Sequence, residues 1–244
     1  MTRIGLAALA VVLVMTGPAA ADGCRIARIT DGDTLACDDG RLLRLAGLRV
    51  PKPAAWETDA SFAATARAGL SALVLGRAVV WSIAVPDRHG RLRAQLRRDD
   101  GIWLQGEMLR QGLAMVETQR ESRDEAAALL RLEADARAAG LGLWTSRRYQ
   151  VQSVESVRTG GWRIVEGRVL QAVKRNAIVY LNFGADWHKD FTVRLTGDGL
   201  RACAAAGLDP LALEGRRIRV RGWVEWRNGP DIEPDHAEQI EPLD

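Results

Sequence analysis

The stretch that decides the fold contains two short motifs, DGDT at 31–34 and RLAGLRVP at 44–51. Short β-like runs lie on both sides of the first motif. The Asp-Gly pairs at 31–32 and 39–40 are typical of the tight turns that join antiparallel strands. Residues 24–48 therefore predict a meander of three strands, with the first motif at the first turn.

Beyond this meander, three segments have apolar residues at helical spacing and are closed by a glycine. They are 59–75, 104–111 and 123–139, with strands predicted at 78–84 and 92–97. The following region, up to about residue 159, is polar and poorly periodic, which is typical of a linker. We therefore place one domain at 22–147, a linker at 148–160 and a second domain at 161–244.

The second domain is predicted to contain five strands. They lie at 162–173, 177–183, 191–195, 216–226 and 238–241. A helix-like piece at 199–206 falls between the third and fourth strands. Five strands with a helix after the third is the order of an OB barrel.

Five motifs, in this order, resemble the staphylococcal nuclease (thermonuclease) family. They are the two motifs above, DRHGR at 87–91, GEMLRQGLA at 106–114 and LEADARAAGLGLW at 132–144. The resemblance covers 24–144 and implies a five-stranded barrel with three helices. We therefore expect a mainly β protein with helices (α+β), in which this OB barrel is followed by a second, five-stranded OB-like barrel. The active members of the family hydrolyse phosphodiesters in DNA and RNA with the help of calcium.

The resemblance also assigns roles to individual residues. Asp33 resembles the first calcium-binding aspartate, and Arg44 and Arg91 resemble the two phosphate-binding arginines. Arg49 stands where the family has its second calcium-binding aspartate, and Lys52 stands where it has the glutamate that acts as general base. A guanidinium beside Asp33 repels a divalent cation, and a lysine is protonated at neutral pH.

One carboxylate with four cations is a composition that favours holding an anion over activating water. The formal net charge of the whole chain is only +3, so the position of the arginines matters more than their number. The predicted anion-binding residues are Arg44, Arg49, Lys52, His89 and Arg91. Calcium, if it binds at all, is expected at Asp33.

Three functions remain open on this reasoning. The leading one is binding of DNA, RNA or another phosphate-rich polyanion, with the calcium-dependent nuclease chemistry lost or weakened. The second is an active metal-dependent nuclease that uses Asp33, Arg44 and Arg91 with a substitute acid. The acids considered are Asp38, Asp39, Glu57 and Asp59. The third is a protein-interaction module of the cell envelope.

The first 21 residues have the features of a secretory signal peptide. Arg3 precedes an apolar run at 4–15, and a small-residue stretch ends at Ala21. We expect cleavage after Ala21 and a periplasmic or secreted protein without a membrane span. The oligomeric state is left open.

Three cysteines lie in the part that follows. Cys24 and Cys37 are placed almost symmetrically about the turn at 31–32. In a hairpin they would face each other, so they are predicted to form a disulfide, which an exported protein can keep. Cys203 lies in a helix-like pattern and is predicted to be a buried thiol.

Arginines alternate along two predicted strands, with Arg91, Arg93 and Arg97 on one, and Arg217, Arg219 and Arg221 on the other. Such faces either contact nucleic acid or are simply solvated. Four tryptophans are predicted to fill cores, namely Trp81, Trp144, Trp162 and Trp226. The loops at 182–187 and 228–230 are predicted to lie at one barrel rim, either as a site or as plain turns.

Overall fold

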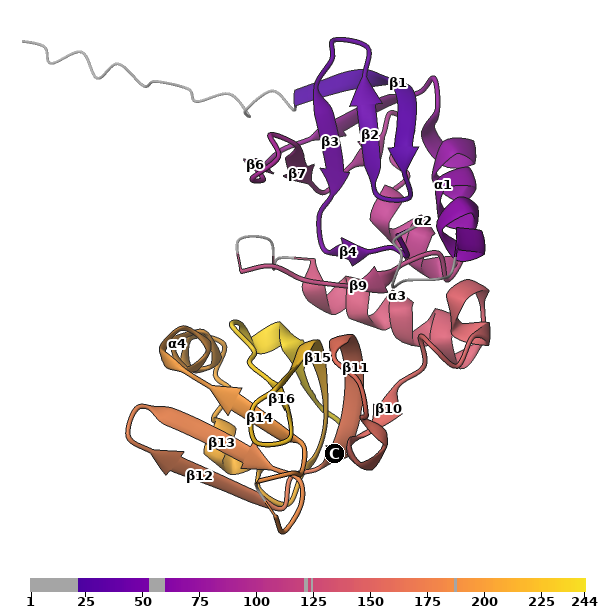
Figure 1. Ribbon diagram of the computed structural model, residues 1–244. Helices are drawn as coiled ribbons and strands as arrows, with labels where there is room; N and C mark the ends of the chain where they lie inside the picture. The colour runs from indigo at the N-terminus through magenta and orange to yellow at the C-terminus, as the bar shows by residue number, and fades with distance from the viewer. Residues whose placement is uncertain (1–21, 53–59, 121–122, 124, 187) are drawn as a thin grey trace, which may run out of the picture.

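The protein is described by a computed structural model that covers residues 22–52, 60–120, 123, 125–186 and 188–244. Two lobes are visible, and each is built on a curled sheet (Figure 1). We call residues 22–147 the N-terminal domain and residues 152–244 the C-terminal domain. The predicted class, mainly β with helices, is confirmed, and the described residues contain four α-helices.

The N-terminal sheet curls because the two halves of its first strand pair with different neighbouring strands. The strand order is β6-β7-β3-β2-β1-β5-β8. Strand β1 pairs with β5 at its start and with β2 at its end, and two register shifts lie in its second half. Strands β3 and β7 are parallel. The bounds are β1 (Asp22–Asp31), β2 (Thr34–Cys37), β3 (Leu42–Leu45), β5 (Ala78–Trp81), β6 (Ala84–Pro86), β7 (Leu92–Ala94) and β8 (Arg97–Arg98).

The three helices predicted for this domain are present. They are α1 (Ala60–Val74), α2 (Leu104–Arg110) and α3 (Ala126–Ala138). Helix α1 buries Ala63, Ala66, Leu70 and Val74, an apolar stripe at helical spacing. This stripe packs on a core that includes Leu35 and other fully buried side chains of the sheet. A two-stranded ribbon, β4 (Leu48–Arg49) with β9 (Met115–Val116), and the 3-10 turn η1 (Gly142–Thr145) complete the domain.

The C-terminal sheet has the order β10-β11-β15-β16-β14-β13-β12, with β17 beside β15 and a parallel pair β14–β16. Helix α4 (Gly197–Ala205) follows β14, as predicted for the strand at 191–195. The strands are β10 (Gln152–Ser153), β11 (Gly161–Arg168), β12 (Gln171–Arg175), β13 (Ile178–Asn182), β14 (Thr192–Leu195), β15 (Arg217–Trp226), β16 (Pro230–Ile232) and β17 (Ile240–Pro242), with 3-10 turns η2 (Val154–Ser156), η3 (Pro210–Leu213) and η4 (Ala237–Gln239). Both sheets divide into more short strands than expected, so two five-stranded barrels stay a prediction.

Two segments differ from the expected elements. The strand expected at 92–97 is divided into β7 and β8, so Arg93 and Arg97 do not share one strand. Part of the segment expected to be a linker belongs to the second sheet. Strand β10 pairs in parallel with β11, and Val154 and Val157 are buried in the C-terminal core. This mostly polar segment can pack against the C-terminal sheet because the two side chains that it buries there, Val154 and Val157, are apolar.

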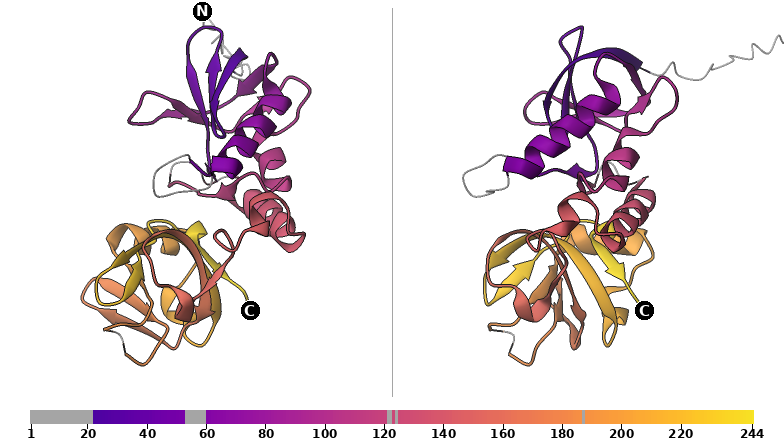
Figure 2. Two further views of the ribbon diagram at one scale, coloured as in Figure 1. Left: turned by 45° about the vertical axis from the view of Figure 1, so that its right-hand side comes forward. Right: turned by 90° about the vertical axis from the view of Figure 1, so that its right-hand side faces the viewer.

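The two lobes share a small apolar cluster where α3 and β9 meet the C-terminal sheet (Figure 2). Met115, Ala136 and Trp144 of the N-terminal domain pack with Trp162 and Ile164 of β11. The predicted burial of Trp81, Trp144 and Trp162 is confirmed, but Trp226 is 54% exposed, so its assignment to a core is wrong. Among the described residues, no helix is both long and apolar enough to cross a membrane.

The predicted disulfide between Cys24 and Cys37 is present and joins β1 to β2. Cys203 is a buried free thiol on α4, as predicted. Burial raises the pKa of the Cys203 thiol to about 11, which keeps it neutral and unreactive.

Replacing both disulfide cysteines, as Cys24→Ser/Cys37→Ser, is expected to lower the free energy of unfolding by about 3 kcal/mol. The bridge closes a loop with a sequence separation of 13, and cross-linking a loop of this size removes entropy of that order from the unfolded chain. Urea unfolding of the double variant and of the native chain with and without reductant measures the loss. Equal midpoints in all three samples would contradict the prediction.

Candidate functional site

The DGDT turn brings two carboxylates together at the end of β1. Asp31 is the last residue of β1 and Asp33 immediately precedes β2. The backbone N–H of Asp33 donates to Asp31 Oδ1 at 3.1 Å. Gly32 lies against α1, because a Cβ atom there would come within 2.8 Å of Ala66 Cβ. The glycine thus lets α1 pack closely against the turn. Asp33, the next residue, is completely buried.

Lys52 lies between these two carboxylates. Its Nζ donates to Asp33 Oδ1 at 2.6 Å and lies 3.1 Å from Asp31 Oδ2. Thr34 Oγ1 donates to Asp33 Oδ1 at 2.7 Å, and Arg44 Nε lies 3.3 Å from Asp33 Oδ2. Two cations therefore neutralise the buried end of the turn.

Burial is the largest influence on the pKa of both carboxyls. It raises the pKa of Asp33 above the usual value, although the charges of Lys52 and Arg44 oppose it. Burial acts on Asp31 in the same sense, but the hydrogen bond with Asp33 and the charge of Lys52 outweigh it and lower the pKa of Asp31. Asp31 is therefore the first of the pair to ionise.

Arg91 reaches the same turn from the loop before β7, across β3, which pairs with β7 on one side and with β2 on the other. Its Nε donates to Asp87 Oδ2 at 2.8 Å, and its Nη1 donates to Thr34 Oγ1 at 3.4 Å. Burial opposes the ionisation of Asp87, but the hydrogen bond from Arg91 lowers the pKa of Asp87 to about 2. The exposed His89 interacts with Arg88 and contacts Asp87 only through its backbone N–H.

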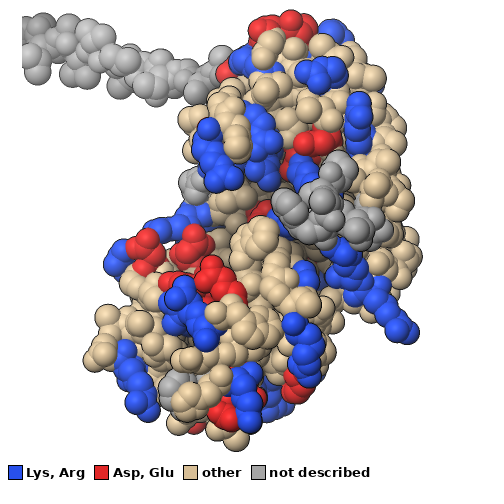
Figure 3. All heavy atoms as spheres, in the orientation of Figure 1, with Lys and Arg blue, Asp and Glu red and all other residues tan. Residues whose placement is uncertain are grey.

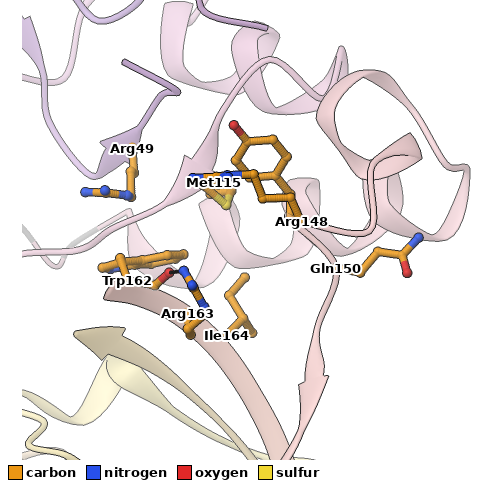
Figure 4. Close-up of a pocket in the computed structure, with 8 residues that line it drawn as sticks. Arg49, Met115, Arg148, Gln150, Trp162, Arg163 and Ile164 are labelled. Carbon is orange, nitrogen blue, oxygen red and sulfur yellow. Dashed lines mark hydrogen bonds between the residues drawn. The ribbon is translucent and has the colours of Figure 1, made fainter. Parts of the chain in front are cut away.

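Arg49 does not join this cluster, because its side chain faces the C-terminal domain. Its guanidinium carbon lies 5.6 Å from the ring centroid of Trp162 and 5.0 Å from that of Trp223. Its Nη1 lies 3.6 Å from Glu117 Oε1. Figure 4 shows Arg49 of β4 and Trp162 of β11 on opposite sides of the domain boundary. The cavity between them holds only about 30 Å³, too little for an organic ligand.

The cluster therefore consists of three cations and three carboxylates. The cations are Arg44, Lys52 and Arg91, and the carboxylates are Asp31, Asp33 and Asp87. Asp31 and Asp87 are not among the site residues predicted from the sequence. Both lie within its motifs, each two or four residues from a site residue, and that spacing is the signal that could have found them.

The acids considered as substitutes lie apart from the cluster or outside the described residues. Asp38 and Asp39 are exposed at the tip of the β2–β3 hairpin, where Asp39 accepts from Arg41 Nε at 2.8 Å. Glu57 and Asp59 lie outside the described residues. Neither hairpin acid contacts Asp33.

The cluster does not fit a calcium ion. Calcium takes six to eight oxygen ligands, whereas the described residues contain no group of three or more Asp, Glu, His or Cys side chains that could hold a metal. The ammonium of Lys52 lies where a cation between Asp31 and Asp33 would have to bind.

The second arginine row does not form one continuous face, because Arg217 is exposed whereas Arg221 is buried. Arg221 is only 1% exposed and crosses to the N-terminal domain, where it donates to Glu133 Oε2 at 2.9 Å and to Val116 O at 3.0 Å. Arg219 and Arg217 both bind Glu166 of β11. Nearby, Thr118 Oγ1 and His236 Nε2 form a buried hydrogen bond of 2.6 Å across the same boundary. Of this row, only Arg221 joins the two domains, whereas Arg217 and Arg219 make their ion pairs within the C-terminal domain.

Comparison with known proteins supports the family resemblance. Residues 42–146 match the family model of staphylococcal nuclease homologues. The match includes both arginines of the cluster, Lys52 and all three helices of the N-terminal domain. No curated protein matches the chain.

Proposed function

We propose that this chain, through its staphylococcal-nuclease-like domain, binds phosphate-rich polyanions such as DNA or RNA and does not hydrolyse them. The observation that carries the proposal is the position of Lys52 Nζ, within 3.1 Å of both Asp31 and Asp33. An ion-paired ammonium in this position neutralises the carboxylates that a metal would need. It also cannot deprotonate a water molecule, which hydrolysis requires.

The two arginines support the binding half of the proposal. Among the described residues, the guanidinium of Arg44 contacts only Asp33, through Nε, so its two terminal nitrogens remain available. Asp87 holds Arg91 through Nε and Nη2, which orients the guanidinium while part of it stays exposed. Oriented guanidinium groups bind phosphate oxygens in pairs. Figure 3 shows Lys and Arg atoms gathered over the β3–β7 side of the N-terminal lobe.

Export is part of the proposal. Residues 1–21 lie outside the described residues, and their sequence is that of a cleaved signal peptide. The disulfide between Cys24 and Cys37 supports an oxidising compartment such as the periplasm or the cell exterior.

The test combines hydrolysis and binding. The mature chain is incubated with single-stranded DNA, duplex DNA and RNA in calcium, in magnesium and in chelator, beside an Arg91→Ala variant that exposes contaminating nuclease. We expect no cleavage above this control. Binding is expected to weaken with added salt, and the slope of log K against log salt should decrease by about 0.9 for each phosphate contact that a variant loses on duplex DNA.

Arg44→Ala and Arg91→Ala should each weaken binding, while Arg67→Ala, which removes an exposed arginine from α1, should not. Metal-dependent cleavage that disappears in Arg91→Ala would overturn the proposal in favour of an active nuclease. An absence of binding to DNA and RNA even at low salt would overturn it in favour of a protein-interaction module.

A further inference from the structure

A second concave surface lies at one rim of the C-terminal sheet, apart from the cluster around Lys52. It is a groove of about 790 Å³, within the usual range for ligand sites. Three segments enclose it, namely residues 154–158, residues 183–184 with 188–191 of the loop between β13 and β14, and the turn between β15 and β16. Loop and turn touch closely, since a Cβ atom on Gly229 would come within 2.6 Å of the carbonyl carbon of Lys189.

The floor of this groove is apolar and its wall is aromatic. Phe183 and Phe191 are buried and pack edge to face, with ring centroids 5.4 Å apart. Pro230 extends the floor. Trp226 lines the groove although more than half of its surface is exposed. An exposed indole ring beside a concave surface is suited to stacking on a flat ring of a ligand.

Several cationic side chains line the groove. Among the described residues, the side chain of Arg158 donates only to Val157 O, at 3.0 Å, and pairs with no carboxylate. Lys189 and Arg227 also line the groove but pair with Asp186 and Glu225 at the surface. Two acids, Glu155 and Asp190, line it as well. Arg158 is therefore the cation that a ligand can engage without breaking an ion pair.

We propose that this groove binds single-stranded nucleic acid, with a base stacked on Trp226 and a backbone phosphate on Arg158. An exposed indole beside a guanidinium that pairs with no carboxylate is suited to a ligand with a flat ring next to a negative group. Every nucleotide of a nucleic acid has both, as a base and a phosphate. A duplex keeps its bases stacked inside and cannot present them to Trp226. The inference extends the proposed function to the second domain but requires neither Arg44 nor Arg91.

The test uses the full mature chain and a fluorescein-labelled oligothymidylate of about ten nucleotides, within the range that one such domain covers. Fluorescence anisotropy at low salt measures binding. Trp226→Ala is expected to weaken binding about 5- to 150-fold, the range for loss of one base–aromatic stack. Trp226→Phe should retain most of the affinity because it keeps a ring. Arg158→Ala should weaken binding and decrease its salt dependence.

Arg175→Ala is the matched control, since Arg175 is exposed at the far end of the β12–β13 hairpin. Duplex DNA should bind equally well to native chain and Trp226→Ala. Oligothymidylate binding that Trp226→Ala and Arg158→Ala leave unchanged would overturn the inference, even if Arg44→Ala shows that the N-terminal cluster binds. Binding that depends on Trp226 but not on Arg44 or Arg91 would support the groove and count against the proposed function.

Discussion

Replacing Arg221 with methionine is expected to lower the free energy of unfolding by about 3 kcal/mol, and to divide a single unfolding transition into two. Removing one partner of a buried ion pair costs about 3–5 kcal/mol, because the remaining charge stays buried. Glu133, which is 1% exposed, loses its bond from Arg221 Nη2. It keeps the N–H of Val116 at 2.7 Å and Arg137 at 3.5 Å, which places the loss at the lower end.

The second transition is expected because Arg221 joins the two domains. It extends from β15 of the C-terminal domain to Glu133 on α3 and to the carbonyl of Val116 on β9. Other contacts across the boundary remain, but each is small or exposed. They are the apolar cluster around Trp162, the hydrogen bond between Thr118 and His236, the stacking of Arg49 on two tryptophans and the exposed ion pair of Arg120 with Asp198. Domains that are coupled weakly no longer unfold as one unit.

Urea unfolding followed by tryptophan fluorescence and by circular dichroism measures both effects. Arg221 also pairs with Glu241 at 2.6 Å, but Glu241 is less deeply buried than Glu133. Arg221→Met/Glu133→Gln should be more stable than Arg221→Met, because it removes the more deeply buried of the two unpaired charges and keeps an acceptor for Val116. Arg217→Met is the control on the same strand. Its partner is Glu166, it is more than half exposed, and it should cost less than about 1 kcal/mol. A loss for Arg221→Met no larger than that of this control would contradict the prediction.

Replacing Lys52 with methionine is the second change with a large expected effect. The variant should lose about 3 kcal/mol at pH 7, because Asp33 is completely buried and would lose the ammonium at 2.6 Å from its Oδ1. Lys52→Arg keeps a cation at this position and should lose much less. Thermal and urea unfolding of both variants and the native chain measure the difference.

The loss in Lys52→Met should depend on pH in a defined direction. The charge of Lys52 lowers the pKa of Asp33, which burial already raises. Without Lys52, the folded-state pKa of Asp33 moves further above its unfolded value of about 3.9. The folded state then holds a proton that the unfolded state releases, so stability falls as pH rises through this interval. The loss of unfolding free energy caused by Lys52→Met should therefore be small near pH 4 and complete at pH 7.

A deficit of the same size at both pH values would show that Lys52 stabilises the turn by packing alone. In the native chain, addition of calcium should leave the unfolding midpoint unchanged, since Lys52 and Arg44 already neutralise the carboxylates. A calcium-dependent increase of the native midpoint would contradict the charge assignment of the cluster, because a ligand that binds only the folded state stabilises it.

The features that depend on local patterns could be predicted from the amino-acid sequence alone. The Asp-Gly turns predict the β1–β2–β3 meander, and the position of Cys24 and Cys37 about one turn predicts their disulfide. Helical spacing of apolar residues predicts α1, α2 and α3 to within a few residues. Each of these features depends on neighbours that are close in the chain, where geometry leaves few alternatives.

The contacts of the charged and aromatic side chains depend on how distant parts of the chain pack together. The sequence predicts an anion-binding role for Arg49 and a nucleic-acid-binding or solvated face for Arg221, yet both side chains are directed to the domain boundary. Trp226 looks like a core residue but lines an open groove. Asp31 looks like an ordinary turn residue, and it shares Lys52 with Asp33. An arginine or tryptophan suits solvent, a ligand or a partner domain equally well. Its partner is selected by how two domains dock, and contacts between residues about a hundred positions apart leave no periodic signal in the chain.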